Sequence, residues 1–452
     1  MLQFINKMEK VKKAPNKKFW LVAVSMGYGH QRTAFPLKEF AKNKSVVNAN
    51  NYPGIPEKDK KIWESTRSFY EFISRFKRVP LIGELAFSIF NKFQQIPAYY
   101  PRRDLSRPTL SLKKVFSLIK KGWGRDLIEK LKRENKQIKE NLPLITTFFI
   151  PAFMAESFGY DGEIFCIICD ADISRSWVSL YPKESRIKYF APNSWVVNRL
   201  KLYGVKQENI FLTGYPLPIE NIGEKDSFEI LKEDLKNRLL NLDPEKRYFS
   251  RYGFLIKEKL GEMPESSDHI LTILFSIGGA GAQKEIAIGF VKSLSEKIKR
   301  EKIRIILSAG IRKEVRDYFL KQIRFLGLEN NLNKNIEILF EKEIGEYFQR
   351  FNQKLRKTDI LWTKPSELSF YSGLGIPIII APSIGSQEDF NKKWLLSLGA
   401  GILQENPAYA DQWIFDYLKS GRFAEAAIQG FVEVEKMGVY NIQEIIKKDE
   451  SF

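Results

Sequence analysis

Short apolar runs alternate with helical patterns along the C-terminal half of this 452-residue chain, and this alternation restricts the fold more than any other feature. The runs are rich in β-branched residues and have the length of strands buried on both faces of a sheet. They occupy residues 270–276, 303–308, 336–340, 360–363, 377–381 and 401–403. Helical patterns lie between them, for example at 312–326, 344–355 and 387–398. Strands separated by such helices predict a parallel, doubly wound sheet.

The N-terminal half begins in the same way. An apolar strand is predicted at 19–25, followed by the turn Gly27-Tyr-Gly-His30 and a helix that starts near Gln31. Pro36 falls in the early turns of that helix, where proline is tolerated. Further strands are predicted at 144–150, 163–168, 187–190 and 210–213. The expected fold class is therefore α/β, with two Rossmann-like, doubly wound parallel sheets.

Changes in composition suggest where the parts of the chain begin and end. We expect an N-terminal Rossmann-like domain over 1–220 and a C-terminal one over 270–430. Residues 221–269 are polar and charged, which is typical of a helical connector. The last segment, 431–452, is predicted to be a helix and is a candidate to return to the N-terminal domain.

The stretch at about 59–141 differs from the rest of the N-terminal half, because it is helical, aromatic and basic. Residues 101–140 contain thirteen Lys or Arg against five Asp or Glu, in a chain of net charge +19. Apolar stripes at helical spacing recur there (Phe69, Phe72, Ile73, Phe76; Leu85, Ile89, Phe90, Phe93; Leu112, Phe116, Ile119, Trp123). Such stripes usually pack into a core. Large apolar residues beside cations are also typical of helices at a membrane surface, so both interpretations stay open for this insertion.

The bulk properties favour a cytoplasmic protein. No apolar run approaches the roughly 20 residues that a membrane-spanning helix needs, and the basic N-terminus lacks the apolar stretch of a signal peptide. Cys166 and Cys169 form a C-x-x-C within an apolar, β-rich run. A redox C-x-x-C normally opens a helix, so we interpret these residues as two buried core thiols.

A glycine-rich turn follows the first predicted strand of each half, at Gly27-x-Gly29 and Gly278-Gly-Ala-Gly281. Glycines permit close backbone approach, and the helix that follows offers free N–H groups to phosphate. Neither turn has the spacing of a dinucleotide fingerprint or a P-loop. A tight strand-to-helix turn would explain each of them taken alone. Because both turns follow the first strand of their half of the chain, we favour the interpretation that they are ligand-binding loops.

Three polar residues are candidates for chemistry in the N-terminal half. His30 lies at the carboxyl edge of the first strand and could accept a proton from a hydroxyl, because its ordinary pKa is roughly 6.5; alternatively it bonds to backbone. Asp170 directly follows a buried strand, and we prefer it to Asp172, which an ordinary turn also explains. His269 is predicted to be solvated in its polar surroundings. The sequence has no cluster of Cys and His ligands, so no metal site is predicted.

With these residues assembled, the chain resembles the family-28 glycosyltransferases. That family includes the lipid-linked N-acetylglucosaminyltransferase of peptidoglycan synthesis, monogalactosyldiacylglycerol synthase and the processive diacylglycerol glucosyltransferases. The matching motifs occur in the family's order at 26–34, 189–194, 202–205, 209–216, 276–281, 363–365, 375–377, 385–388 with Asn391, and 398–401. The first of them, Met26-Gly-Tyr-Gly-His-Gln-Arg-Thr-Ala34, is similar to the family's G-x-G-H-x-x-x-A.

The resemblance implies a GT-B fold, with the acceptor in the N-terminal domain, a nucleotide-sugar donor in the C-terminal domain and chemistry in the cleft between them. It implies an inverting, metal-independent hexosyltransferase that needs no cofactor and uses a UDP-sugar as co-substrate. His30 and Asp170 match the proposed catalytic positions, and Gly27 and Gly29 belong to the acceptor loop. The implied donor-binding residues are Gly278, Gly279, Gly281, Lys364, Glu367, Gln387 and Glu388. Glu367 is the carboxylate nearest to the family's ribose-binding glutamate, although the segment 363–377 is shorter than the family's.

The leading hypothesis is therefore transfer of a hexose to a hydroxyl of a membrane lipid, either diacylglycerol-like or polyprenyl-linked. The protein would act in the cytoplasm on the inner face of the cell membrane, in peripheral contact with its anionic surface. A nucleotide-sugar 2-epimerase on the same fold is one alternative, and a non-catalytic sugar-nucleotide-binding protein is another. Nucleic-acid binding is disfavoured, because no RNA or DNA module accompanies the positive charge.

Overall fold

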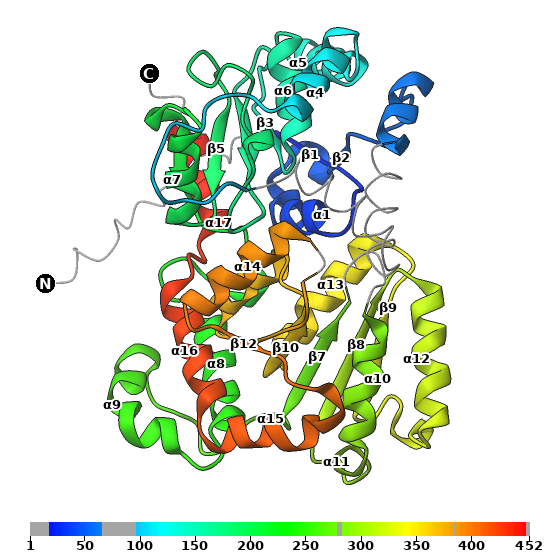
Figure 1. Ribbon diagram of the computed structural model, residues 1–452, viewed down its shortest axis with the longest axis vertical. Coiled ribbons are helices and arrows are strands. Elements are labelled where there is room, and N and C mark those ends of the chain that lie inside the picture. The colour runs from blue at the N-terminus through cyan, green and yellow to red at the C-terminus, as the bar shows by residue number, and fades with distance from the viewer. Residues whose placement is uncertain (1–17, 66–95, 278–282, 384, 449–452) are drawn as a thin grey trace, which may run out of the picture.

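A computed structural model describes residues 18–65, 96–277, 283–383 and 385–448 of the chain (Figure 1). It contains two six-stranded sheets, and every strand pair in both is parallel. Helices flank the sheets, so the two doubly wound α/β domains predicted from the sequence are confirmed. Figure 1 shows the N-terminal domain above the C-terminal one.

The N-terminal sheet has the strand order β2-β1-β3-β4-β5-β6. Its strands are Trp20–Ala23 (β1), Val47–Asn48 (β2), Leu144–Thr146 (β3), Ile164–Ile167 (β4), Lys188–Ala191 (β5) and Ile210–Leu212 (β6). The associated helices are Gly29–Ala34 (α1), Leu110–Lys120 (α4), Arg125–Ile138 (α5), Phe149–Ser157 (α6) and Ser194–Leu202 (α7). The central strands are fully buried, as expected for continuous apolar runs in a parallel sheet.

The C-terminal sheet has the order β12-β11-β10-β7-β8-β9. Its strands are Thr272–Ser276 (β7), Arg304–Gly310 (β8), Ile336–Phe340 (β9), Ile360–Thr363 (β10), Ile378–Ile380 (β11) and Gly401–Leu403 (β12). The helices around it are Glu229–Leu242 (α8), Arg247–Leu260 (α9), Lys284–Ser293 (α10), Ser295–Lys299 (α11), Lys313–Phe325 (α12), Ile344–Leu355 (α13), Ser386–Ser397 (α14), Ala410–Lys419 (α15) and Arg422–Glu433 (α16). All six strands lie within one or two residues of the ranges predicted from the sequence.

Each sheet has one point where the direction of strand addition reverses. In the N-terminal sheet this point lies between β1 and β3, and in the C-terminal sheet it lies between β7 and β10. At such a switch point the loops that leave the carboxyl ends of the two central strands turn away from each other, and open α/β sheets bind ligands in the resulting crevice. The topology therefore defines one crevice on each domain.

The structure differs from the predicted elements at two places in the N-terminal half. The predicted strand 144–150 ends at Thr146, and α6 starts at Phe149. The helix that carries His30 ends at Ala34, so Pro36 lies instead in the following 3-10 helix, Phe35–Phe40. The missing N–H of Pro36 costs little there, because it occupies the first turn of that helix.

The third apolar stripe of the basic insertion packs into the N-terminal core. Leu112, Phe116, Ile119 and Trp123 of the third apolar stripe are all buried. For this stripe the core interpretation is correct, and the membrane-facing interpretation is wrong. The two earlier stripes, at 69–76 and 85–93, lie outside the described residues.

The segment 221–269 contains two helices that belong to the C-terminal core. Leu235 and Leu239 of α8 are buried with Ile256 and Leu260 of α9 in the apolar cluster of that domain. The last helix, Gly438–Lys448 (α17), crosses to the N-terminal domain, where it packs in one cluster with residues of β1 and β4. No helix of the described residues is long and apolar enough to cross a membrane.

Candidate functional site

The loop between β1 and α1 uses its two glycines for different reasons. Gly27 has a φ of +93°, a left-handed conformation that favours glycine. A Cβ atom on Gly29 would come within 3.3 Å of Glu367 Oε2, which belongs to the other domain. Gly29 therefore permits close approach of the two domains at the first turn of α1.

His30 lies at the switch point of the N-terminal sheet. Its Nδ1 is 2.8 Å from the carbonyl oxygen of Thr147, which follows β3. Because a carbonyl only accepts, Nδ1 carries the proton of the neutral ring and Nε2 is left as an acceptor. Removal of the ring from water lowers the pKa of His30 to about 4. The geometry therefore holds a neutral imidazole that can accept a proton at Nε2.

The surroundings of His30 are aromatic and also include a thiol. The ring centroids of Phe148 and Trp177 lie 4.7 and 6.3 Å from that of His30. The sulfur of Cys169 is 3.5 Å from His30 Nδ1. Cys166 and Cys169 are both free and buried, as predicted, and burial raises the pKa of the Cys169 thiol well above its usual value. The thiol beside His30 is therefore neutral.

Asp170 follows β4 and faces the C-terminal domain. Its Oδ1 accepts a hydrogen bond of 3.3 Å from Nδ2 of Asn391, on α14. Burial, followed by the nearby charges of Glu367 and Glu388, raises the pKa of Asp170 to about 6. A carboxyl group with such a pKa can exchange a proton near neutral pH.

Asp172 has a different, structural role. It forms a buried ion pair with Arg199, at 2.7 Å, and accepts a hydrogen bond from the indole of Trp195. Both acceptor oxygens are thus occupied by groups of α7. This arrangement distinguishes the two carboxylates, and only Asp170 faces the other domain.

Three of the predicted donor residues, Lys364, Gln387 and Glu388, lie at the carboxyl edge of the C-terminal sheet. Lys364 directly follows β10 and forms an ion pair with Glu388 of α14. Gln387 precedes Glu388 in the first turn of that helix. Gly278, Gly279 and Gly281 lie outside the described residues, although β7 ends at Ser276, in register with Thr363 at the end of β10.

Glu367 does not stand with the other donor candidates but points across the domain interface. Its Oε1 is 3.3 Å from Nε of Arg32, and both side chains are almost fully buried. The Arg32 guanidinium also lies over the rings of Phe348 and Phe351, at 4.7 and 4.3 Å from their centroids. This contact joins α1 of one domain to α13 of the other.

Two further contacts across the interface were not predicted from the sequence. Asn391, which accepts a hydrogen bond of 2.7 Å from the backbone of Ala171, bridges α14 and the segment after β4. Tyr28, between the two glycines of the first loop, accepts a hydrogen bond of 3.0 Å from the backbone of Ile311. Asn391 lies one helical turn beyond Gln387 and Glu388, and this spacing is the signal that could have placed it in the site.

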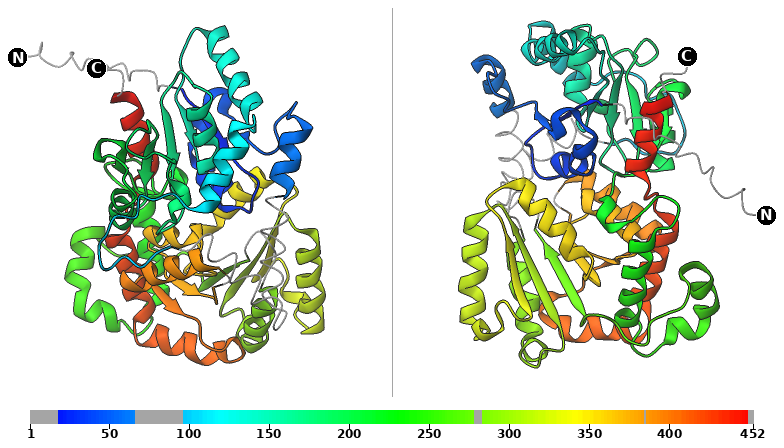
Figure 2. Two further views of the ribbon diagram at one scale, coloured as in Figure 1. Left: turned by 45° about the horizontal axis from the view of Figure 1, so that its top comes forward. Right: turned by 180° about the vertical axis from the view of Figure 1, so that it is seen from behind.

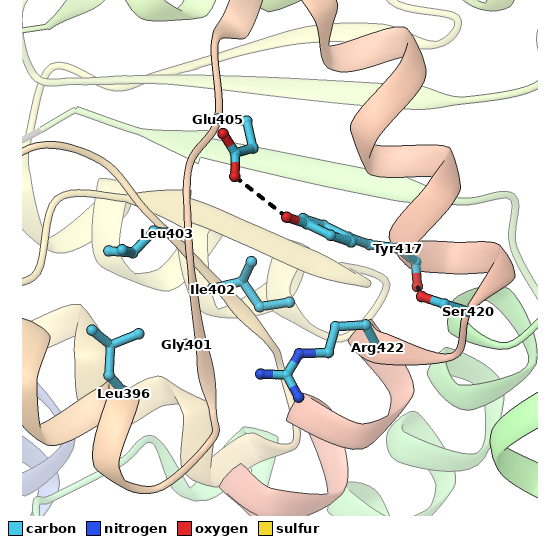
Figure 3. Close-up of a pocket in the computed structure, with 8 residues that line it drawn as sticks. All are labelled: Leu396, Gly401, Ile402, Leu403, Glu405, Tyr417, Ser420 and Arg422. Atoms are coloured by element: carbon cyan, nitrogen blue, oxygen red, sulfur yellow. Dashed lines mark hydrogen bonds between the residues drawn. The ribbon is translucent and has the colours of Figure 1, made fainter.

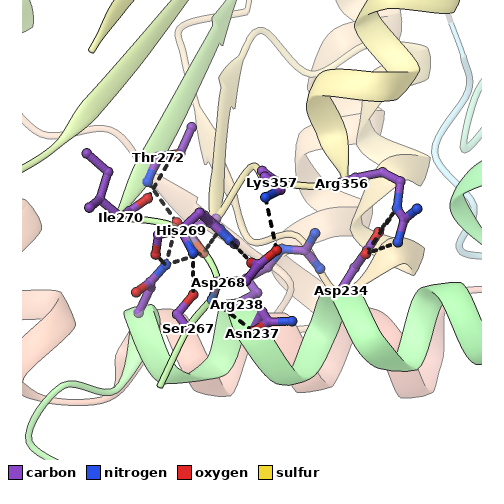
Figure 4. Close-up of polar contacts among 12 residues, drawn as sticks. Asp234, Asn237, Arg238, Ser267, Asp268, His269, Ile270, Thr272, Arg356 and Lys357 are labelled. Atoms are coloured by element: carbon purple, nitrogen blue, oxygen red, sulfur yellow. Dashed lines mark hydrogen bonds and ion pairs between the residues drawn. The ribbon is translucent and has the colours of Figure 1, made fainter. Parts of the chain in front are cut away.

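Two hollows elsewhere in the C-terminal domain contain none of the predicted site residues. One, of about 370 Å³, lies between β12 and α15 (Figure 3). The other, of about 390 Å³, lies beside α8 and is bordered by ion pairs such as Asp234–Arg356 (Figure 4). Within the described residues, no group of three or more His, Cys, Asp or Glu side chains is arranged to hold a metal ion.

The expectation that His269 is solvated is wrong. Its side chain is only 4% exposed and contacts Asp268 at 2.5 Å and Asp359 at 3.2 Å; Figure 4 labels His269 and Asp268. Although burial opposes it, the two carboxylates raise the pKa of His269. The residue lies where β7 begins, beside the start of β10, and therefore at the opposite edge of the sheet from the carboxyl ends of these strands.

Comparison with known proteins gives limited matches. A family described as a domain of unknown function, DUF6938, matches residues 264–330, which include β7 and β8. No curated protein matches the sequence.

Solved structures match most of the chain at low identity. S. aureus MnaA bound to UDP is 12% identical, with 96% of each chain covered and a TM-score of 0.46. Acinetobacter baumannii MurG is 13% identical, with 96% of this chain and 99% of that chain covered and a TM-score of 0.45. The UDP-GlcNAc 2-epimerase of Methanocaldococcus jannaschii is 14% identical, with 96% and 100% covered and a TM-score of 0.43.

Proposed function

We propose that the chain is a nucleotide-sugar-dependent hexosyltransferase with its reaction site between the two domains. The observation that supports this proposal is that residues from the crevices at the two switch points, one on each domain, are in contact. His30 and Asp170 come from the N-terminal crevice, and Asn391 joins Asp170 directly to α14, whose Glu388 is paired with Lys364. Crevices of this kind bind nucleotides and their phosphates, so a nucleoside diphosphate sugar is the expected donor.

The proposed transfer is a direct displacement. The oxygen of an acceptor hydroxyl forms a bond to the anomeric carbon of the sugar, while the bond from that carbon to the diphosphate breaks. The hydroxyl proton passes to Nε2 of His30 or to the carboxylate of Asp170, and the nucleoside diphosphate leaves with the electron pair. The acceptor lies on the N-terminal side, and the reaction inverts the anomeric configuration.

The donor diphosphate is proposed to lie against the loop 278–281 and Lys364. A cation and backbone N–H groups stabilise the negative charge that develops on a leaving diphosphate, which would remove the need for a resident metal or cofactor. Lys364 would then exchange its partner Glu388 for the diphosphate, and Gln387 and Glu388 would contact the sugar or the ribose.

A membrane lipid is the proposed acceptor, on the basis of the family-28 motifs and the exposed cations near the start of α4. Incubation with lipid vesicles and a panel of labelled UDP-sugars tests this proposal. We expect sugar to be transferred to a lipid by the natural sequence and not by His30→Ala or Asp170→Asn. Lys44→Ala, an exposed change in the same domain, is the matched control. Absence of both UDP binding by calorimetry and transfer to any lipid would overturn the proposal.

A second candidate function is epimerisation of a UDP-sugar at C2. The structure gives one reason to keep it: Glu367 and Glu388 both lie close enough to Asp170 to raise its pKa, and epimerases of this kind use several carboxylates. Conversion of UDP-N-acetylglucosamine in the absence of any acceptor would favour the epimerase. Strict dependence of donor consumption on an acceptor would favour the transferase. UDP binding without either reaction would indicate a non-catalytic binding protein.

A further inference from the structure

Helix α9 projects from the C-terminal domain and carries apolar side chains on its outer face. Figures 1 and 2 show it at the edge of the molecule, away from the body of the sheet. Ile256 and Leu260 attach the helix to the core and are each 4% exposed. Phe254 is 80% exposed and Leu255 is 53% exposed. An exposed leucine is ordinary, but a phenylalanine and a leucine side by side on a projecting helix form an unpartnered apolar tip.

Cations surround this apolar tip. Residues 246–260 contain five Lys or Arg and a single acid, Glu258. Arg251 is exposed and lies three and four positions before Phe254 and Leu255, so it shares their side of the helix. Three of the other cations form exposed ion pairs, such as Arg247–Glu245 at 3.1 Å. Exposed pairs of this kind contribute little to stability and can be exchanged for another anion.

A second basic segment lies along the same side of the molecule. Residues 96–109, the extended cyan segment in Figure 1, run beside α7, where the backbone N–H of Leu105 donates to Leu202 at 2.9 Å. Tyr100 is 66% exposed, and Arg102 and Arg103 next to it are also exposed. The view in Figure 1 and the view from behind in Figure 2 place this segment and α9 on the same lateral side of the molecule. One flat anionic surface could therefore contact both domains.

We propose that α9 docks on an anionic lipid bilayer, with Phe254 and Leu255 inserted at the boundary of headgroups and acyl chains and Arg251 against the lipid phosphates. Helix α9 lies outside the basic insertion at 59–141, and its docking does not depend on the sugar chemistry proposed above. A bilayer fits better than a protein partner, because a stable protein interface needs about 800 Å² on each side, which a convex tip of two apolar residues does not offer. A bilayer needs no complementary shape, and apolar residues beside cations are what its interface binds.

The first experiment tests directly whether residue 254 enters the bilayer. Phe254→Cys in the full chain is labelled with an environment-sensitive fluorophore, and Cys166 and Cys169 stay unlabelled because they are buried. Phe325→Cys is the matched control: Phe325 is 84% exposed and ends α12, on the opposite side of the domain (Figure 1). Vesicles that contain phosphatidylglycerol should shift the emission to the blue for the label at 254 and leave the label at 325 unchanged. No shift at 254, or equal shifts at both positions, would overturn the proposal.

The second experiment measures affinity by co-sedimentation with the same vesicles. F254S/L255S should weaken binding about tenfold or more, since each apolar side chain that inserts contributes that order of affinity. Phe325→Ser should bind like the natural sequence, and Arg251→Gln should weaken binding to anionic vesicles and reduce its dependence on salt.

Unchanged binding of F254S/L255S would refute the role of α9. A dimer that F254S/L255S dissociates, without any vesicle binding, would assign the tip to self-association instead. Neither experiment contains a nucleotide sugar, so their failure leaves the transferase proposal unaffected.

Discussion

Nε of Arg32 in the N-terminal domain lies 3.3 Å from Oε1 of Glu367 in the C-terminal domain, and the two side chains are only 2% and 12% exposed. The guanidinium also stacks over rings of α13. The helix that presents His30 to its crevice is thus tied to the opposite domain by a buried charge pair. The candidate site and the domain interface therefore depend on the same few residues.

Arg32→Ala is expected to destabilise the protein by about 3–5 kcal/mol, because it leaves a buried carboxylate without its partner. Urea unfolding measured by circular dichroism at pH 7.5 gives this free energy. Lys44→Ala removes the partner of an exposed pair with Glu39 and should leave the midpoint unchanged. If Arg32→Ala unfolds at the same urea concentration as the natural sequence, the pair does not hold the domains together.

The pKa values of the two histidines in the chain are expected to differ from the ordinary value in opposite directions. Burial lowers the pKa of His30 to about 4, so His30 contributes stability above roughly pH 6.5 that is lost as the pH falls toward 4. The raised pKa of His269 makes its contribution present below roughly pH 6.5 and lost as the pH rises through the raised value.

Histidine-selective NMR can check both titrations, because the chain contains only two histidines. Signals are assigned with His30→Gln and His269→Gln. A signal for His30 that titrates near pH 6.5 would contradict the buried, neutral ring described above. His30→Gln should also flatten the loss of stability between pH 6.5 and 4.

Asp170→Asn is expected to stabilise the protein at neutral pH while it prevents the proposed reaction. The pKa of Asp170 is raised to about 6, so the stability that its neutral form contributes is present below roughly pH 3.9 and lost as the pH rises through 6. Asparagine keeps the shape and avoids the buried charge. We expect a gain of about 1–3 kcal/mol at pH 7.5 and almost none at pH 4, measured by urea unfolding.

Asp172→Asn is the matched control for that change and should have the opposite effect. It breaks the buried pair with Arg199 and should cost about 3–5 kcal/mol at pH 7.5. Equal effects of the two substitutions would show that the environments of Asp170 and Asp172 do not differ as described.

The sequence predicts the sheets well because their strands are buried on both faces and read as continuous apolar runs. The same property explains the error at 144–150. The first turns of α6 are apolar on all sides and buried, so a strand and a helix cannot be separated there by periodicity. β2 was not predicted, because Val47–Asn48 is too short to form a pattern.

The candidate site was predicted only in part. Its motifs are short stretches of sequence, whereas its contacts join residues that are far apart in the sequence. His30 and Asp170 could be found from their position after apolar strands. The partners of these groups are far away in the sequence: Thr147 lies 117 residues from His30, and Asn391 lies 221 residues from Asp170. His269 was predicted to be solvated because its neighbours are polar, and only the fold brings Asp359 to it from 90 residues away.

Gly310 and Tyr28 offer a test of how the first loop meets the C-terminal domain. Gly310 ends β8 with a φ of +64°, and a Cβ atom there would lie 2.3 Å from the hydroxyl oxygen of Tyr28. Gly310→Ala should therefore destabilise the protein in two ways, by backbone strain of about 1–2 kcal/mol and by displacing Tyr28. Tyr28→Ala removes the obstacle but not the strain, so the double variant should be more stable than the sum of the single effects predicts. The coupling is measured by a double-mutant cycle of unfolding free energies. Strict additivity would mean that Tyr28 does not rest on Gly310 in solution, and the loop that carries His30 would then be free of the C-terminal domain.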